Sequence, residues 1–373
     1  MSVVVGVPRE VKTAEHRVAM TPAGANELVR RGHRVVVESG AGVGSSIPDA
    51  DYAAAGAEVI DGAEKVWGSA DLVVKVKEPV AEEYDRLRPG LSLFTFLHLA
   101  ADEPLTRALL AKRVNSVAYE TVTGRTGGLP LLYPMSEVAG RLAPLEGAHT
   151  LMRAHGGRGV LMGGVSGVRP AQVVVIGAGA AGMNATATAV GMHADVTVLD
   201  LDVDKLRAAD RVYQGRIRTV VSNSLEVEAA VTQADLVIGA VLVPGAKAPT
   251  LVSNDLVSRM RPGSVLVDIS IDQGGCFEDS RPTTHSDPTF RVHDSVFYCV
   301  ANMPGAVPHT STRALTNVTL PHLTALVDRG WTAALRADAG LAAGLTTHDG
   351  TLYSGPVGVA HGIEAAAPAA LLG

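Results

Sequence analysis

The sequence has little cysteine, no excess of basic residues and no long apolar run. Two cysteines, Cys276 and Cys299, occur among 373 residues, and they form neither a CxxC pair nor a plausible disulfide framework. We therefore expect reduced thiols in a reducing compartment. The 32 basic residues are outnumbered by 38 acidic ones, and the net charge of −6 argues against a nucleic-acid-binding surface. No apolar stretch approaches the roughly 18 residues of a membrane span.

Several motifs that carry chemistry are also missing. The opening MSVVVGVPREVK contains acidic and basic side chains and has no long apolar core, so it does not resemble a signal peptide. The twelve histidines form no HxxxH or HExxH pattern, which predicts no metal site. Neither a GxSxG elbow nor a P-loop lysine is found. These absences predict a soluble cytoplasmic protein that is not a zinc hydrolase, serine hydrolase or P-loop enzyme.

The sequence does contain a repeated alternation of short β-branched runs with segments rich in alanine and leucine, which is typical of βαβ units. The strands expected from these runs span residues 3–7, 34–39, 71–77, 92–99 and 116–120, and then 172–177, 195–200, 217–222, 235–241, 264–270 and 295–300. Near-continuous apolar strands predict parallel sheets that are covered on both faces. The predicted fold class is α/β, with two Rossmann-like doubly wound parallel-sheet domains and a cleft between them.

Helix signals and the order of the elements predict the domain organisation. Thr21 is a candidate N-cap, Pro22 suits the first helical position, and Gly32 suits the C-terminal end of the same helix. The chain after residue 308 is interpreted as helical and is expected to pack back on the first domain. The predicted domains are a substrate domain at 1–130, a nucleotide-binding domain at 131–308 and a helical part at 309–373 that completes the first.

The stretch GAGAAG directly follows the apolar run QVVVI and opens a helical segment. Gly177 suits the tight turn, Gly179 lets the backbone approach a pyrophosphate, and Gly182 permits close packing of helix and strand. Asp200 ends the next strand, about 20 residues further on, where a carboxylate binds the ribose hydroxyls of NAD and repels the 2′-phosphate of NADP. The context predicts an NAD site. A second glycine-rich stretch at residues 40–44 follows a second strand and has serine at its sixth position, so we interpret it as a loop.

Charged side chains stand where three strands of the first domain are expected to end. They are Arg17 in a loop, Lys75 and Lys77 in KVKEP, and His98 in SLFTFLHLAAD. In parallel sheets, ligands bind outside the carboxyl ends of the strands, so these side chains could converge on a substrate. Strand alternation places both lysines on one face and does not choose between them. Each of these cations could instead be an ordinary solvated surface charge.

His98 has two interpretations, because it closes a run that is typical of a buried strand. It could be a core histidine whose ring nitrogens are hydrogen-bonded, or an acid/base group at a site. In the second domain, Asp268 and Asp272 lie near the end of the fifth strand, in DISIDQGG. Asp272 is expected to lie on the nicotinamide side of the nucleotide. Alternatively, it is a turn aspartate that forms hydrogen bonds with the nearby backbone.

Together, the motifs VGVPRE, HRVAMTPAG, KVKEP, LFTFLHLAA, PMSEVAGR, GGRGVLMGGV, VIGAGAAG, GAVLVPGAKAP, VDISIDQGG and YCVANMPGAVP resemble the bacterial L-alanine dehydrogenases. The resemblance runs from about the third residue to roughly Leu326. It implies reversible oxidative deamination of L-alanine to pyruvate and ammonia with NAD, by a homohexamer with a discontinuous substrate domain. The related NAD-binding subunit of transhydrogenase has a similar plan, but its RQD-type loop is not found here.

The resemblance also implies the role of individual residues. Arg17 and Lys77, rather than Lys75, would bind the substrate, while His98 would be the acid/base and Asp272 its partner across the cleft. Lys75 is expected to tolerate loss at ordinary surface or packing cost. The NAD site would be lined by Ser136, Gly177, Gly179, Ala180, Ala181, Gly182, Asp200, Lys205, Ser222, Val241, Leu242, Ile269, Ser270, Ile271, Asp272, Arg281, Val300, Ala301, Asn302 and Met303.

Two alternative functions remain open from the sequence. A non-catalytic NAD-sensing module would need none of Arg17, Lys77, His98 and Asp272. A transhydrogenase-type subunit would need a membrane partner. Turnover of alanine with NAD by the purified chain would separate both from a dehydrogenase.

Overall fold

The computed structural model describes residues 2–241 and 248–373, and the chain divides into two compact units. The first unit is Met1–Pro134 with Val307–Gly373, and the second is Met135–Ala306. The first unit is therefore formed from two separate stretches of chain. The boundaries expected from the sequence, after residues 130 and 308, lie a few residues away. The roles assigned to the two units, substrate binding and NAD binding, stay predictions.

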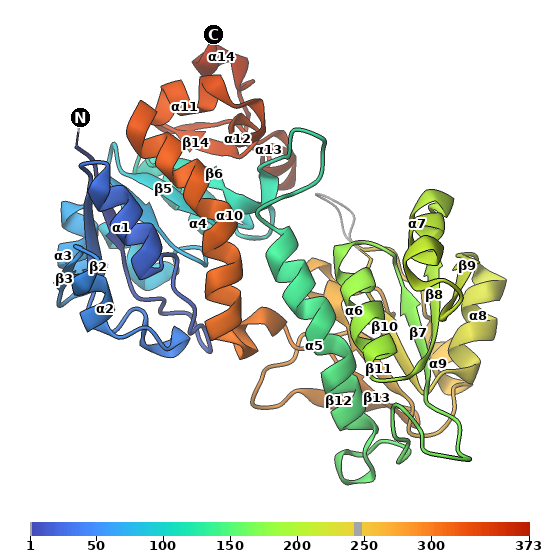
Figure 1. Cartoon of the computed structure of the whole chain (residues 1–373). Coiled ribbons are helices and arrows are strands. Elements are labelled where there is room, and N and C mark those ends of the chain that lie inside the picture. Colours follow the sequence, from blue (N-terminus) through green and yellow to red (C-terminus); the bar gives the residue numbers. More distant parts are fainter. Residues whose placement is uncertain (1, 242–247) are drawn as a thin grey trace. The chain divides into compact units, whose positions relative to one another are not determined.

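The sheet of the first unit has the strand order β15-β14-β6-β5-β4-β1-β2-β3 (Figure 1). Its strands are β1 (Val4–Val7), β2 (Arg34–Glu38), β3 (Glu58–Ile60), β4 (Leu72–Val74), β5 (Ser92–Thr95), β6 (Asn115–Ala118), β14 (Leu345–His348) and β15 (Thr351–Leu352). β1 to β6 pair in parallel, so their carboxyl ends lie along one edge. The strand order reverses between β1 and β4, where a doubly wound sheet typically binds its ligand.

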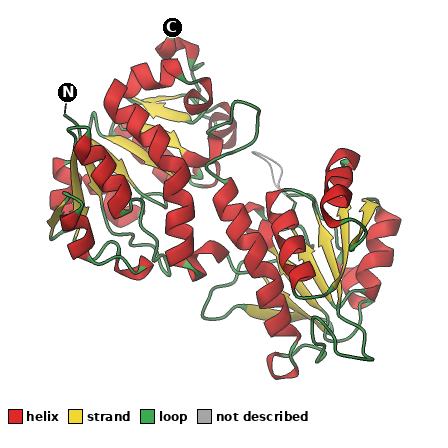
Figure 2. Cartoon of the chain, in the orientation of Figure 1, coloured by secondary structure: helices red, strands yellow, loops and turns green. Residues whose placement is uncertain are grey.

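Helices of the first unit flank this sheet (Figure 2). They are α1 (Pro22–Arg30), α2 (Asp49–Ala54), α3 (Ala63–Ser69), α4 (Glu103–Ala111), α10 (Pro308–Arg329), α11 (Trp331–Ala337), α12 (Ala339–Ala342), α13 (Gly355–His361) and α14 (Ala369–Leu372). Thr21 caps α1 as the sequence predicts, because its hydroxyl accepts a hydrogen bond from Gly24 N–H at 3.3 Å.

The sheet of the second unit has the order β12-β13-β11-β10-β7-β8-β9. Its strands are β7 (Gln172–Ile176), β8 (Asp195–Asp200), β9 (Ile217–Val221), β10 (Leu236–Gly239), β11 (Val265–Asp268), β12 (Thr289–Val292) and β13 (Ser295–Tyr298). The accompanying helices are α5 (Tyr133–Leu151), α6 (Ala180–Gly191), α7 (Val203–Tyr213), α8 (Ser224–Gln233) and α9 (Asn254–Ser258). The order reverses between β7 and β10, as it does between β1 and β4 in the first sheet.

Burial of both sheet faces explains why the strands are almost wholly apolar. Along β7, Val173 and Val175 belong to one buried cluster, while Val174 and Ile176 belong to another. Successive strand side chains point to opposite faces, so each face is covered by its own hydrophobic layer. The expected α/β class with two doubly wound sheets is confirmed.

Two expectations about local structure are wrong, and two edge strands were not predicted. The tail after residue 308 is not only helical, because β14 pairs antiparallel with β6 and forms a hairpin with β15. The edge strands β3 and β12 were not expected, since both are short and half exposed. β4 ends at Val74 and β5 at Thr95, several residues before the ends expected from the sequence.

Among the helices of the described residues, none combines the length and the apolar character of a membrane-spanning segment.

Candidate functional site

The glycine loop after β7 has the geometry that its sequence predicts. Gly177 has φ +108°, and a Cβ there would lie 2.5 Å from the carbonyl oxygen of Ala240. A Cβ on Gly182 would collide with the carbonyl oxygen of Gly177, so this glycine allows the close packing of α6 on the strand. A Cβ on Gly179 would meet nothing within 4 Å, which leaves open space beside the amino end of α6. Free N–H groups at a helix start in open space suit a phosphate group.

Asp200 at the end of β8 lies directly beside this loop. Its Oδ2 accepts a hydrogen bond from Ala178 N–H at 2.6 Å, and its Oδ1 accepts one from Asp202 N–H at 2.8 Å. Lys205 Nζ lies 3.8 Å from Oδ2. The carboxylate therefore fixes the glycine loop relative to β8 and keeps lone pairs for a further donor such as a hydroxyl group.

Most of the other residues expected at an NAD site follow the carboxyl ends of parallel strands in this unit, and these ends share one edge of the sheet. They are Ser222 after β9, Val241 after β10, Ile269, Ser270, Ile271 and Asp272 after β11, and Val300, Ala301, Asn302 and Met303 after β13. Ser136 lies in α5, whose Gly140 packs against Ala181. The Arg281 guanidinium stacks on Phe290 at 4.1 Å. Leu242 lies outside the described residues.

Lys75 in the first unit is not a surface charge. Its side chain is 0 % exposed, and Nζ lies 3.1 Å from Glu10 Oε2 and 3.0 Å from Glu83 Oε1. Burial acts to lower the pKa of Lys75, but the two carboxylates outweigh it and raise the pKa. The expectation that Lys75 is lost cheaply is therefore wrong, because its removal would leave two buried carboxylates without their cation.

Glu10 connects the loop after β1 to the end of β4, at the point where the strand order reverses. Its Oε1 accepts a hydrogen bond from Val76 N–H at 2.6 Å. Burial raises the pKa of Glu10, and the nearby Lys75 only partly offsets this effect. Lys75 and Glu10 thus hold the backbone that leads to Lys77.

Arg17 is also buried, with 2 % of its surface exposed. Glu15 accepts hydrogen bonds from Arg17 Nε at 2.7 Å and from the backbone N–H of Arg17 at 3.0 Å, and its second oxygen pairs with the guanidinium. Both residues line a cavity of about 520 Å³ that is bounded by residues 9–12, 14–17, 40, 41, 43 and 44. The glycine-rich stretch at 40–44, expected to be a loop, is a turn that runs into a short 3-10 helix at Val43–Ser45, and it lines this cavity. A guanidinium held at a cavity wall is suited to bind a carboxylate.

Lys77 lies just beyond the end of β4 and is partly exposed. Its carbonyl oxygen accepts a hydrogen bond from Thr95 Oγ1 at 3.0 Å, which joins this segment to β5. Burial acts to raise the pKa of the adjacent Glu78, but the ion pair with Lys12 and the charge of Lys77 outweigh it and lower the pKa. Lys77 is therefore the exposed lysine of KVKEP, and Lys75 is the structural one.

His98 is neither a core residue nor part of β5. Its side chain is 45 % exposed, and its backbone has φ +49°, in the left-handed region. Glu120 accepts a hydrogen bond from His98 N–H at 2.6 Å, and the same carboxylate lies 4.0 Å from Nδ1. The ring stacks on Phe96 at a centroid distance of 5.8 Å and an interplanar angle of 1°. These contacts fix the imidazole and leave it accessible.

The four acidic residues that hold these cations were missed by the sequence analysis. They are Glu10, Glu15, Glu83 and Glu120. Glu10, Glu15 and Glu83 lie outside the expected strands, whereas Glu120 is the last residue of the strand expected at 116–120. Nothing local in the sequence distinguishes a buried acid from a solvated one. Glu15 and Glu83 lie two and eight residues from the cations that they pair with, so proximity in the sequence was the available signal for them, whereas Glu120 is 22 residues from His98.

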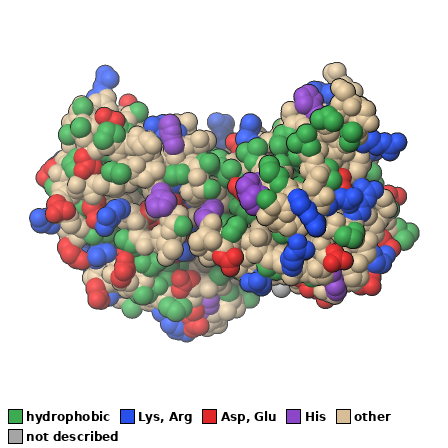
Figure 3. Space-filling model, turned by 90° about the horizontal axis from the view of Figure 1, so that it is seen from below, with side chains coloured by type: hydrophobic (Ala, Val, Ile, Leu, Met, Phe, Trp, Pro, Cys, Tyr) green, Lys and Arg blue, Asp and Glu red, His purple; other side chains and the backbone are tan. Residues whose placement is uncertain are grey.

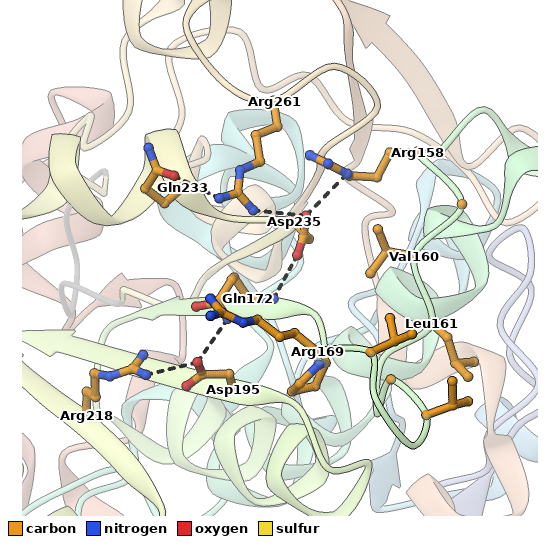
Figure 4. Close-up of a pocket in the computed structure, with 15 residues that line it drawn as sticks. Arg158, Val160, Leu161, Arg169, Gln172, Asp195, Arg218, Gln233, Asp235 and Arg261 are labelled. Carbon is orange, nitrogen blue, oxygen red and sulfur yellow. Dashed lines mark hydrogen bonds and ion pairs between the residues drawn. The ribbon is translucent and has the colours of Figure 1, made fainter.

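A second cavity, of about 660 Å³, opens at the amino ends of β7, β8 and β10 (Figure 4). Asp235 lies 3.3 Å from Arg158 Nε and 3.5 Å from Arg261, and it accepts a hydrogen bond from Gln172 N–H at 2.8 Å. Doubly wound sheets bind ligands at the carboxyl ends of their strands, so this cavity does not belong to the NAD site.

The remaining polar features are surface charges, candidate metal ligands and the two cysteines. On the face drawn in Figure 3, basic and acidic side chains are interspersed. Among the described residues, no three His, Cys, Asp or Glu side chains are grouped as a metal ion would require. Both cysteines are free and buried.

Comparisons with known proteins identify the family. The model of the alanine dehydrogenase/PNT N-terminal domain matches residues 6–139, and that of the C-terminal domain matches residues 143–355. The chain belongs to the alanine dehydrogenase/PNT family. The family member named alanine dehydrogenase from Mycolicibacterium smegmatis is 63% identical over 350 residues, which cover 94% of each chain.

Two solved structures of the alanine dehydrogenase/PNT type are similar over nearly the whole chain. An L-alanine dehydrogenase has a TM-score of 0.93 and 47% identity, covering 96% of this chain and 98% of its own. A transhydrogenase from Sinorhizobium meliloti has a TM-score of 0.79 and 27% identity, covering 94% and 98%. The likeness to the first is the stronger one.

Proposed function

We propose that this chain is an NAD-dependent L-alanine dehydrogenase, which catalyses the reversible oxidative deamination of L-alanine to pyruvate and ammonia. The observation that carries the proposal is the 63% identity with an alanine dehydrogenase over 94% of the chain. The glycine loop, Asp200 and the side chains of Arg17, Lys77 and His98 in the first unit are the parts that such an enzyme needs.

The residues present fit NAD. The open space at Gly179 and the helix start beside it accommodate a pyrophosphate, and Asp200 can accept hydrogen bonds from ribose hydroxyls. We assign to the NAD site the strand-end residues described above, with Ser136, Ala180, Ala181, Lys205, Arg281 and Leu242 as further members. When bound, NAD would accept the hydride that leaves Cα of alanine.

We assign substrate binding to Arg17 and Lys77. Arg17 is fixed at the wall of its cavity by Glu15, so its guanidinium can bind the alanine carboxylate without first losing side-chain freedom. Lys77 is partly exposed at the neighbouring strand end, and its ammonium group would bind the carbonyl oxygen of pyruvate. Together, they would orient the substrate, which is an entropic contribution to the rate.

His98 is assigned as the general acid/base, with Asp272 as its partner. After oxidation, water must add to the imine carbon and ammonia must leave, so protons have to be removed and delivered near neutral pH. A histidine side chain suits both transfers, because imidazole can both accept and donate a proton. His98 and Asp272 are both exposed, so both side chains are accessible for these proton transfers.

The deciding experiment is NADH formation by the purified chain with a panel of small amino acids. We expect L-alanine to be the preferred substrate, and absence of turnover with alanine would contradict the proposal. Turnover by the purified chain alone would also separate a dehydrogenase from an NAD sensor and from a transhydrogenase-type subunit that depends on a membrane partner.

We further propose that the enzyme is cytoplasmic and forms a homohexamer. The first unit would bind the substrate and the second would bind NAD. Sedimentation of the purified chain would test the oligomeric state, since a monomer and a hexamer differ sixfold in mass.

A further inference from the structure

A buried carboxylate lies at the end of β11, just before the loop that carries Asp272. The side chain of Asp268 is fully buried. Its Oδ1 accepts a hydrogen bond from Ser270 N–H at 2.9 Å, and its Oδ2 accepts one from Cys276 N–H at 2.9 Å and one from Ser280 Oγ at 2.5 Å. The thiol of Cys276 also points to Oδ1, at 3.5 Å. One carboxylate thus binds both ends of the loop from Ser270 to Cys276.

This loop leaves little room around the carboxylate. It begins as a short 3-10 helix at Ile269–Gln273, for which Asp268 is the N-cap. It then turns through two glycines, and a Cβ on Gly275, which has φ +75°, would lie 2.9 Å from Asp268 Oδ2. Asp272 is exposed between these two fixed ends. Its position therefore depends on the hydrogen bonds that Asp268 accepts.

The same network extends to the loop after β10. The hydroxyl of Ser270 donates a hydrogen bond to the carbonyl oxygen of Val241 at 2.8 Å, and it lies 3.1 Å from Val241 N–H. The groups that meet Asp268 are all hydrogen-bond donors, and a carboxylate supplies only acceptors. An amide of the same shape would instead point an N–H group at one of these donors. Asp268→Asn therefore changes the loop with little change in side-chain volume.

We propose that Asp268 is a positioning residue, which holds the loop 269–276 so that Asp272 and the nicotinamide side of the NAD site have their catalytic arrangement. This inference rests on the proposed function. Because its side chain is fully buried, Asp268 would act through the loop and not by contact with substrate or cofactor. A misplacement of about 1 Å at a reacting group can lower a rate by about 100-fold.

The test compares Asp268→Asn with a matched control, Asp235→Asn. Asp235 is buried in the same unit and also accepts a backbone hydrogen bond, but it lies at the amino edge of the sheet (Figure 4). We expect Asp268→Asn to lower kcat for alanine by about 10- to 100-fold, with the KM for alanine changed less than about threefold. Asp235→Asn should lower the melting temperature and leave kcat near that of the wild type.

A double-mutant cycle separates positioning from general loss of structure. If Asp268 acts through Asp272, then Asp268→Asn should have little further effect on kcat in an Asp272→Asn background. Should Asp268→Asn fail to fold, Ser280→Ala provides the second variant, because it removes one donor and keeps the carboxylate. We expect it to lower kcat by a smaller factor than Asp268→Asn.

Three outcomes would overturn the proposal. The first is that folded Asp268→Asn has the same kcat as Asp235→Asn. The second is that Asp268→Asn lowers kcat by the same factor in the wild-type and Asp272→Asn backgrounds. The third applies if Asp268→Asn does not fold, and is an unchanged kcat in Ser280→Ala. Failure of the proposed function is a different result, since the wild type itself would then form no NADH with alanine. Binding of NADH, followed by its fluorescence, gives a readout that does not depend on turnover.

Discussion

Replacing Lys75 by methionine should destabilise the protein strongly, although a lysine in this stretch of sequence could equally be a surface residue. The side chains of Lys75, Glu10 and Glu83 are 0 %, 2 % and 1 % exposed, and both ion pairs are close to 3 Å. Removing the cation leaves two carboxylates in a buried site with no opposite charge beside them. Breaking a buried ion pair in this way typically costs about 3–5 kcal/mol.

That free energy corresponds to a large change in melting temperature. For a domain of about 150–250 residues, 1 kcal/mol shifts the midpoint by about 2–4 °C, so the expected decrease is roughly 6–20 °C. The matched control is Lys77→Met, which should keep the wild-type midpoint and lose turnover with alanine. The two lysines are two residues apart, and the assays should separate them completely.

Removing all three charges tests the structural role of Lys75 further. The variant Lys75→Met with Glu10→Gln and Glu83→Gln should recover most of the lost stability, since replacing a whole buried ionic group is often neutral or stabilising. Thermal unfolding followed by circular dichroism measures all four proteins. A midpoint for Lys75→Met within about 2 °C of the wild type would refute the structural role of this lysine.

Three further predictions concern the site. His98→Ala should fold and bind NADH but lose about 10²- to 10⁴-fold in alanine turnover, and near-normal turnover in the folded variant would remove His98 from the mechanism. Asp200→Ala should weaken NAD binding and reduce the preference for NAD over NADP, and steady-state kinetics with both cofactors would measure this change. A wild-type protein that used NAD and NADP equally well would contradict this role of Asp200. Because the pKa of Glu78 is lowered from 4.5 in the folded state, its charge should stabilise the protein at neutral pH, and this contribution should be lost as pH falls below about 4.5. The difference in melting temperature between wild type and Glu78→Gln should therefore shrink between pH 7 and pH 3, and a constant difference would exclude the linkage.

The second unit was largely predictable because its signals are local. The strand before GAGAAG, the helix after it and the acid at the end of the next strand all lie within 30 residues, so the sequence alone indicates their arrangement. Gly177 and Gly182 are required by close backbone contacts that the motif already implies. The same holds for Thr21 and Pro22, since a helix start depends on neighbouring residues.

The surroundings of Lys75, Lys77 and His98 were less predictable because they depend on residues that are distant in the sequence. Alternation along an expected strand placed Lys75 and Lys77 on one face, but β4 ends at Val74 and the alternation ends with it. Burial of Lys75 depends on Glu10, which is far from it in the chain. The exposure of His98 likewise follows from the early end of β5 and from the contact with Glu120. Short edge strands such as β15 carry too few residues to give a pattern.

The pairing of β14 with β6 has a consequence for biosynthesis. Thr347 and Ser116 are adjacent in the sheet, so the first unit cannot close until nearly all of the chain has left the ribosome. The second unit is contiguous and can fold earlier, while the N-terminal strands wait with β6 as an open edge. A nascent chain that has emerged from the ribosome only as far as residue 306 would therefore display a folded second unit together with a first sheet whose β6 edge is unpaired. Chaperone binding to such stalled chains should concentrate on residues 92–118.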